Sequence, residues 1–446
     1  MASYYLLLVF SITMCALWSV IPTQPKAPAP RVAIIGGGAA GLVTAKTLLE
    51  VGWTPDLYEQ YDTIGGTWNY DESHTNKHSA MYKNLRTNLP KELMLMEGLD
   101  YKTQDRSYLN HTEVLDYLND YVVKFDLKKV IKFETKVTNV VRSPDDNWVV
   151  TSHHLPSGTI ETREYDAVFV CNGHYFLPNT PKLEGADSFK GRSIHSHAYR
   201  VPENFAGQKV LIIGSGPSGR DIAVDLAPHV KKVYLSHHEQ DLDTLGFPKP
   251  IELKPDVSRL EENAVIFADE TKCEVDAIIY CTGYEFSFPF LDDSCGVNVD
   301  ENYVNPLYIQ IINIRHPTMF FIGLPFRTFI FQMLELQAKC CLRVLTGDAQ
   351  LPSEEEMEDA RQREIESLKN RGYPKRKYHL IAAMVKEYLS LVAEIGGLPP
   401  LNEVFYKIYY ETGLRRKNEF LNYRNYVYKI LDERNFNISY RNETEK

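Results

Sequence analysis

The sequence predicts an α/β fold with two similar units, because one pair of patterns occurs twice along the chain. Each pair begins with an apolar strand that runs through a glycine-rich turn into a helix, at 31–52 and at 209–227. Each pair ends with a second apolar strand that stops at Asn-Gly or Thr-Gly, within 165–175 and 275–284. Strands that alternate with helices are typical of parallel sheets. We therefore expect two Rossmann-like dinucleotide-binding domains.

The first glycine-rich turn, at 36–41, reads GGGAAG and fits the G-x-G-x-x-G fingerprint in its expected strand–turn–helix context. Gly36 permits the tight turn, Gly38 lets the backbone approach a pyrophosphate, and Gly41 lets the helix pack on the strand. The helix N-terminus then offers free N–H groups to the phosphates. Strand 54–60 ends near a carboxylate that can bind ribose hydroxyls. The binding residues predicted here are Gly36, Gly38, Ala39, Ala40, Gly41, Glu59 and Gln60.

The second turn, at 214–219, reads GSGPSG and lies between a strand and a helix in the same way. Two dinucleotide folds in one chain imply two dinucleotides. A bound flavin and a diffusible nicotinamide are the economical pair, because hydride passes from one to the other. The predicted nicotinamide-binding residues of the turn are Gly214, Ser215, Gly216, Pro217, Ser218 and Gly219.

The strand within 231–240 should report the type of nicotinamide, since an Arg near its end favours a 2′-phosphate and an acid favours a free 2′-hydroxyl. Its end reads Ser236, His237, His238 and Glu239. Imidazoles can hydrogen-bond a phosphate, but Glu239 opposes one, and Arg220 lies on the fingerprint helix instead. We predict that Ser236, His237 and His238 bind the nucleotide, and the residues leave NADPH and NADH open.

Composition and charge exclude several classes of function. The chain is 44% hydrophobic and 24% charged, with a formal net charge of −10, which argues against nucleic acid as a partner. The seven cysteines show no C-x-x-C spacing, so neither a zinc ribbon nor a disulfide scaffold is expected, and we predict no metal site. The pattern SEEE at 353–356 predicts a capping box, Ser353 to Glu356, at the start of a solvated helix.

The N-terminus resembles a secretory segment. Residues 4–20 are uncharged and apolar, and a Pro-rich spacer follows at 21–30. We expect a signal peptide at 1–22, with an uncleaved anchor as the alternative. Sequons at Asn110, Asn437 and Asn442 fit that route. The expected product is a secreted or lumenal glycoprotein that keeps no membrane span after signal removal.

Two loops between the fingerprints carry groups suited to a flavin. IGGTW at 64–68 places a glycine pair beside an indole, and 81–94 is polar and Asn-rich between apolar residues. A glycine pair permits close approach to a planar ring, and an Asn side chain offers both a donor and an acceptor. On composition alone these loops could equally be structural.

The segment FKGRSIHSHAYR at 189–200 has no helical or strand period, yet it connects the two fingerprints. It resembles the identifying motif of the flavin-containing monooxygenases, F-x-G-x-x-x-H-x-x-x-[YF], which Phe189, Gly191, His195 and Tyr199 match. IGGTW, LRTNLPKELM, CTGY at 281–284 and the stretch at 321–339 resemble further segments of that family, so the similarity covers about 31–345.

The resemblance implies a domain layout and a chemistry. The nicotinamide domain, 202–285, is inserted in an FAD domain made of 30–201 and 286–446 with C-terminal helices. NADPH reduces FAD, a C4a-hydroperoxyflavin forms with O₂, and a tertiary amine or sulfide takes the distal oxygen. Asn88 matches the family Asn near the flavin and is the catalytic side chain that we predict. Further cofactor-binding residues implied by the matching segments are Gly66, Thr67, Trp68, Asn88, Thr282, Gly283 and Gln337.

Alternatives remain on the sequence alone. Baeyer–Villiger monooxygenases share the F-x-G-x-x-x-H core but continue with Trp, so Tyr199 favours N- and S-oxygenation. A non-catalytic secreted flavoprotein would explain the missing Arg near His237. A disulfide reductase would need a cysteine pair in its flavin domain, where the first cysteine after Cys15 is Cys171. Chain length and the secretory start resemble insect members of the family, including those that N-oxygenate plant pyrrolizidine alkaloids, and we expect a homo-oligomer.

Overall fold

The structure is a computed structural model that describes residues 29–73, 79–238 and 242–441. The predicted signal peptide, Glu239 and the sequon at Asn442 lie outside the described residues. Of the other two sequons, Asn437 is exposed, whereas Asn110 is half-buried and caps a helix.

A seven-stranded sheet forms the first unit, with the order β20-β21-β22-β7-β1-β2-β3. Strands β22, β7, β1, β2 and β3 run parallel to their neighbours, and β20 and β21 are antiparallel additions at one edge. Their bounds are β1 (Val32–Ile35), β2 (Asp56–Tyr58), β3 (Ile131–Lys132), β7 (Ala167–Val170), β20 (Leu307–Tyr308), β21 (Ile312–Asn313) and β22 (Met319–Phe321). Every residue of β1 and β7 is buried, as expected of parallel strands covered on both faces.

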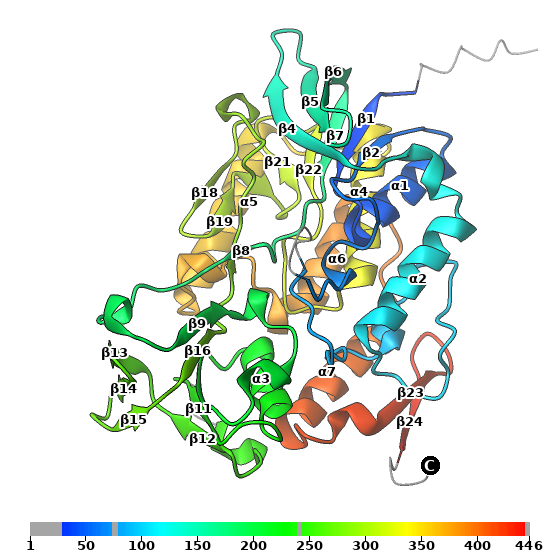
Figure 1. The fold of residues 1–446 in the computed structure, drawn as a ribbon. Coiled ribbons are helices and arrows are strands. Elements are labelled where there is room, and N and C mark those ends of the chain that lie inside the picture. The colour runs from blue at the N-terminus through cyan, green and yellow to red at the C-terminus, as the bar shows by residue number, and fades with distance from the viewer. Residues whose placement is uncertain (1–28, 74–78, 239–241, 442–446) are drawn as a thin grey trace, which may run out of the picture.

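A second parallel sheet has the order β12-β11-β10-β16-β9. Its strands are β9 (Arg192–His195), β10 (Lys209–Ile213), β11 (Lys232–Ser236), β12 (Ile251–Lys254) and β16 (Ala277–Tyr280). Since β22 returns to the first sheet after β16, the second unit is inserted in the first, which confirms the predicted α/β architecture (Figure 1). Strand β9 precedes the predicted boundary at 202, so the second sheet takes its edge strand from the segment assigned to the first domain.

Seven α-helices cover these sheets in the described part of the chain. They are α1 (Ala39–Glu50), α2 (His111–Lys124), α3 (Pro217–Leu226), α4 (Ile330–Leu345), α5 (Glu354–Asn370), α6 (Val385–Ile395) and α7 (Glu403–Asn418). The predicted capping box is present at α5, where the Ser353 hydroxyl accepts from the Glu356 N–H and the Glu356 carboxylate accepts from the Ser353 N–H. Helix α3 lies between the second sheet and the C-terminal region that contains α7 (Figure 1).

Smaller antiparallel elements complete the fold, and the sequence pattern did not predict them. One three-stranded sheet stands above the first unit in Figure 1, and another belongs to the second unit. The bounds are β4 (Thr135–Arg142), β5 (Trp148–His154), β6 (Thr159–Tyr165), β13 (Val257–Glu261), β14 (Ala264–Phe267), β15 (Lys272–Glu274), β8 (Leu177–Pro178), β17 (Tyr284–Glu285), β18 (Asn298–Asp300), β19 (Tyr303–Asn305), β23 (Tyr426–Ile430) and β24 (Phe436–Tyr440).

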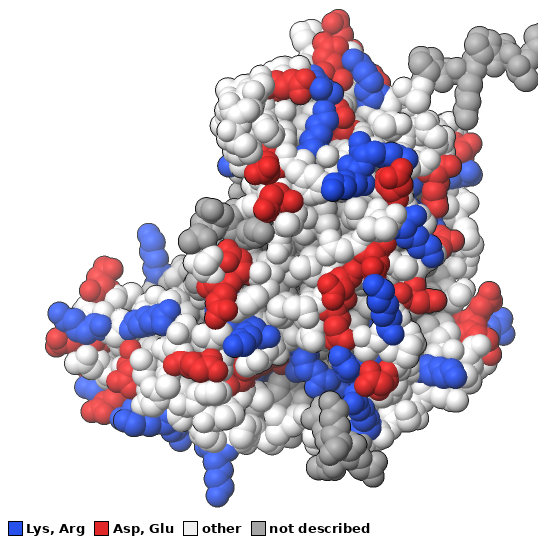
Figure 2. Space-filling model, turned by 45° about the vertical axis from the view of Figure 1, so that its right-hand side comes forward, with Lys and Arg blue, Asp and Glu red and all other residues white. Residues whose placement is uncertain are grey.

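The surface carries charges of both signs side by side on the face shown in Figure 2. Within the described residues, no helix is long and apolar enough to span a membrane. The six described cysteines are all free.

Candidate cofactor and active site

The first glycine-rich turn forms a cradle that admits no side chains at two of its positions. Gly36 has φ +113°, and a Cβ there would lie 2.5 Å from the carbonyl oxygen of Cys171 at the end of β7. A Cβ on Gly41 would lie 1.9 Å from the Gly36 carbonyl oxygen. Gly38 is the N-cap of α1 and makes no side-chain cap, so the first N–H groups of α1 are open to an anion.

Glu59 follows β2 and braces this cradle. Its Oε2 accepts from the Gly37 N–H at 2.8 Å, and its Oε1 accepts from the Tyr61 N–H at 2.9 Å. Burial raises the pKa of Glu59, and the backbone donors oppose that shift. Each oxygen keeps a second lone pair for a ribose hydroxyl, as the sequence predicts. Gln60 beside it is half-buried.

The glycine pair at 65–66 closes the cradle from the other side. The Gly65 N–H donates to the Gly37 carbonyl at 3.0 Å, and a Cβ on Gly66 would lie 3.3 Å from the Gly38 Cα. Thr67 and Trp68, both half-buried, follow in the same 3₁₀ turn. The Thr67 hydroxyl oxygen is buried and has no hydrogen-bond partner among the described residues. A bare glycine wall and an orphaned hydroxyl fit a flavin dinucleotide bound at this place.

The second turn repeats the first with little change. Gly214 has φ +100°, and its Cβ would lie 2.7 Å from the carbonyl oxygen of Cys281 at the end of β16. A Cβ on Gly219 would lie 1.9 Å from the Gly214 carbonyl oxygen. Gly216, the N-cap of α3, has nothing within 4 Å of its Cβ position, which leaves room for a pyrophosphate. Ser215 is buried, whereas Pro217 and Ser218 are exposed at the start of α3.

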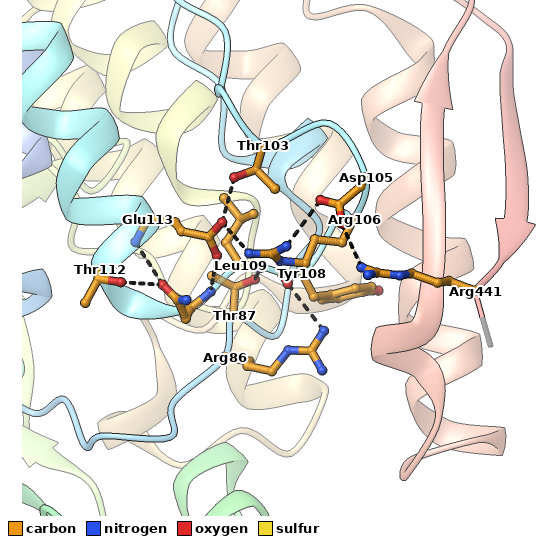
Figure 3. A network of polar contacts seen from close by, with 11 residues as sticks. Arg86, Thr87, Thr103, Asp105, Arg106, Tyr108, Leu109, Thr112, Glu113 and Arg441 are labelled. Carbon is orange, nitrogen blue, oxygen red and sulfur yellow. Dashed lines mark hydrogen bonds and ion pairs between the residues drawn. The ribbon is translucent and has the colours of Figure 1, made fainter. Parts of the chain in front are cut away.

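Asn88 lies in a segment that is fixed on both sides while its own amide makes no hydrogen bond to a described residue. The Thr87 N–H donates to the Leu109 carbonyl at 2.7 Å, and the Leu109 N–H donates to the Thr87 hydroxyl at 3.1 Å (Figure 3). Arg86 donates to the Tyr108 carbonyl at 3.4 Å in the same view. Asn88 is half-buried. The backbone around Asn88 is therefore held in place, while its side-chain amide makes no hydrogen bond within the described part of the chain.

The loop at 103–113 that supports Asn88 is itself cross-linked. Arg106 pairs with Glu113 at 2.6 Å and with Asp105 at 3.2 Å, and Arg441 reaches Asp105 at 3.0 Å (Figure 3). Glu113 also completes the capping box of α2 with Asn110. This network ties the end of β24 to the loop that packs against the Asn88 segment.

Three further predicted residues differ in burial: Thr282 is half-buried, Gly283 is exposed and Gln337 is fully buried. The Thr282 hydroxyl donates to the Asn179 carbonyl, and the Gly283 carbonyl accepts from the Asn179 N–H at 3.0 Å. Gln337 is fully buried: its Oε1 accepts from the Gly323 N–H at 2.9 Å and its Nε2 donates to the Tyr388 hydroxyl at 2.7 Å. Both ends of this amide are thus engaged within the protein, so Gln337 holds the loop at Gly323 in place, and its contact with cofactor stays a prediction.

The connector motif forms the junction between the two units. Phe189 packs into the core of the second unit, and a Cβ on Gly191 would lie 2.4 Å from the Phe189 ring, which explains the F-x-G spacing. His195 ends β9 and lies against the ring of Tyr284. The Tyr199 hydroxyl donates to the Asp225 carboxylate on α3 at 2.6 Å. The motif thus makes packing and hydrogen-bond contacts at the junction, and its role in alignment rather than in acid–base catalysis stays a prediction.

Sequence reasoning missed a cluster of aromatic and imidazole rings at the carboxyl ends of β7 and β16. Ring centroids lie 4.3 Å apart for His174 and Tyr175, 5.0 Å for His174 and Phe286, 5.4 Å for Tyr175 and Tyr284, and 5.1 Å for Phe286 and His379. His174 and Tyr175 come from NGHYF, and Tyr284 and Phe286 come from TGYEF. Both segments follow strand ends where ligands bind in open α/β sheets, whereas His379 comes from a distant part of the chain. That position is the signal that could have revealed them.

Comparison with known proteins decides the family. The sequence pattern of the family described as "Flavin-binding monooxygenase-like" matches residues 29–242 and 240–408. The chain belongs to this family. It is 33% identical to senecionine N-oxygenase of Tyria jacobaeae over 92% of each chain, and 35% identical to flavin-containing monooxygenase FMO GS-OX3 of Arabidopsis thaliana over 84% of this chain and 86% of that one.

Solved structures agree with that membership. S-allyl-L-cysteine S-oxygenase from Allium sativum superposes with a TM-score of 0.83 at 34% identity, covering 89% of this chain and 95% of that one. Cyclohexanone monooxygenase shares the fold, with a TM-score of 0.60 at 16% identity. The protein is thus a flavin-dependent monooxygenase that uses FAD and NADPH. The binding of FAD in the first cradle and of NADPH in the second stays a prediction.

The end of β11, where Ser236, His237 and His238 are the predicted nucleotide-binding residues, lies beside β12. Lys254 of β12 lies opposite Ser236 in the sheet, and its carbonyl accepts from the His237 N–H at 2.9 Å. His238 Nδ1 lies 3.6 Å from Asp256. The Lys254 ammonium lies 2.8 Å from Glu252 and is thus already paired, so nucleotide binding by Ser236, His237 and His238 stays a prediction.

His379 should make the stability of the folded protein depend on pH. It is 1% exposed, and its Nε2 accepts from the Val304 N–H at 3.0 Å while its Nδ1 contacts Gln310 Oε1 at 3.0 Å. Burial, with a smaller contribution from the nearby His174, lowers the pKa of His379 to about 3. In the unfolded chain the imidazole of His379 binds a proton near pH 6.5, whereas in the folded chain it stays neutral. The free energy of unfolding should therefore fall as the pH drops from about 6.5 towards 4, by about 1.4 kcal/mol per pH unit at most.

Urea unfolding at several pH values measures this slope. The variant His379→Gln should show a shallower slope over the same window, whereas His153→Gln, on β5 of the separate small sheet, should leave it unchanged. An equal slope in wild type and His379→Gln would contradict the prediction.

Proposed function

We propose that this monooxygenase inserts one oxygen atom of O₂ into the nitrogen of neutral tertiary amines, plant alkaloids among them, and into the sulfur of thioethers. The other oxygen atom leaves as water, and NADPH supplies the two electrons. The relatives support both acceptors, since one is named an N-oxygenase and another an S-oxygenase. When bound, reduced FAD supplies the activated oxygen.

The observation that carries the proposal is the wall of rings at the two strand ends. Tyr175 and Tyr284 present apolar faces, and burial lowers the pKa of His174 to about 4, which keeps that imidazole neutral at physiological pH. The charged group that acts on Tyr175 is the cation Arg327. The Arg327 cation repels a protonated amine at this place, and the neutral His174 offers it no countercharge, so the free base or an uncharged thioether is favoured.

The chain's own residues position the reactants. Asn88 offers an unused amide donor and acceptor, and the rings at the two strand ends offer apolar contact area to a substrate. The glycine cradles hold both dinucleotides through backbone N–H groups and helix dipoles. This arrangement needs no nucleophilic side chain.

Purified protein should be tested for NADPH consumption and product formation with tertiary-amine alkaloids, thioethers and a cyclic ketone, with NADH as the alternative reductant. We expect the flavin band near 450 nm to bleach with NADPH and N-oxide or sulfoxide to form, at rates that rise with pH as the amine loses its proton. A lactone product from the ketone would indicate a Baeyer–Villiger enzyme instead. Protein without flavin, or NADPH oxidation that yields no oxygenated product, would overturn the proposal.

A further inference from the structure

Arg424 lies between α7 and β23, and its guanidinium contacts both units of the protein. Its Nη2 and Nη1 donate to the Asp221 carboxylate at 2.6 and 3.2 Å. Asp221 belongs to α3, the helix that begins at the NADPH cradle. Both side chains are less than a fifth exposed. A two-pronged pair of this kind fixes direction as well as distance.

The other edge of the same guanidinium reaches the segment that carries Asn88. Its Nε donates to the Thr87 carbonyl at 3.0 Å, and its Nη2 donates to the Arg86 carbonyl at 3.3 Å. In return, Arg86 Nη2 donates to the Arg424 carbonyl at 3.4 Å. One planar group thus joins the NADPH-binding helix to the peptide bond directly before Asn88.

Neighbouring contacts connect the same two elements. The Tyr82 hydroxyl approaches Asp221 at 3.4 Å, and Asn84 donates to Asp225 at 2.8 Å. Arg424 differs from Tyr82 and Asn84 because its planar guanidinium donates both to the Asp221 carboxylate and to two backbone carbonyls. Removing it would also leave Asp221 short of a partner in a mostly buried place, which is costly.

We propose that Arg424 is a positioning residue that fixes Asn88 relative to the NADPH-binding helix. The proposal rests on the role of Asn88 in the proposed function. Without Arg424, the segment that carries Asn88 is no longer held at a fixed distance and orientation from α3. We then expect the two electrons of NADPH to reduce O₂ to H₂O₂ instead of supporting oxygenation of the substrate.

The test compares Arg424→Met, Arg424→Lys and Asp221→Asn with the matched control Arg415→Met. Arg415 pairs with Glu411 and Glu419 on the C-terminal region and does not reach the second unit. The readouts are hydrogen exchange of the amides at 84–93 and in α3, the dissociation constant of NADP⁺, and the ratio of product to NADPH consumed.

For Arg424→Met we expect exchange at 84–93 to rise about tenfold and the product ratio to fall several-fold, with Arg424→Lys intermediate because an ammonium keeps one contact only. Asp221→Asn should reproduce the effect even if Arg424→Met folds poorly. Unchanged exchange, or an equal change in Arg415→Met, would overturn the proposal. Exchange and NADP⁺ binding decide it even if the enzyme oxygenates no tested substrate, so its failure is distinct from failure of the proposed function.

Discussion

Gly41→Ala should yield protein that no longer retains FAD. The new methyl group would lie 1.9 Å from the Gly36 carbonyl oxygen, which is backbone and cannot rotate away. Relieving such an overlap displaces α1 from β1 and costs about 3 kcal/mol or more, or about two powers of ten in affinity. Flavin absorbance per protein after gel filtration measures the loss.

Gly219→Ala places a methyl group at the same 1.9 Å from the Gly214 carbonyl oxygen in the second cradle. This variant should keep its flavin and lose NADPH binding, so the two variants separate the two sites. Gly413→Ala is the control, because nothing lies within 4 Å of its Cβ position in α7 and Ala favours a helix by about 1 kcal/mol. Stoichiometric flavin in Gly41→Ala, or flavin loss in Gly219→Ala instead, would contradict the assignment of the cradles.

The cradles could be predicted from sequence because each is a local pattern with a local physical cause. Gly36 and Gly41 contact each other within one turn. The strand before them is buried along its whole length, and its run of apolar residues is visible in the sequence. The Cys171 carbonyl that closes the cradle follows a recognisable buried strand, although its contact with Gly36 spans more than a hundred residues.

The junction could not be predicted in the same way. Asp221 and Asp225 lie on a fingerprint helix, where acids are usually a solvated face. Their partners Arg424 and Tyr199 come from distant parts of the chain, and no local period reports such pairs. Likewise, Gln337 resembles a cofactor ligand in sequence, but the fold engages both ends of its amide.

Asn88→Ser should separate reduction from oxygenation. The Asn88 amide is fixed by its neighbours and free of hydrogen bonds to described residues, so its donor and acceptor are available to the reactants. Losing one such preorganised donor at a reacting centre lowers product formation about 100-fold or more. Flavin content and melting temperature should stay near wild type, because no internal hydrogen bond is lost.

Asn88→Asp sharpens this test, because it keeps the shape, removes the N–H donor and adds a negative charge. Activity in Asn88→Asp would indicate that the acceptor oxygen is the essential group, whereas loss of product in both variants, with NADPH oxidation retained, would indicate that the neutral amide is required. Asn139→Ser, an exposed change on β4, should leave both rates unchanged. Wild-type product yield in Asn88→Ser would remove this residue from the site, and the ring wall at Tyr175 and Tyr284 would then have to orient the substrate alone.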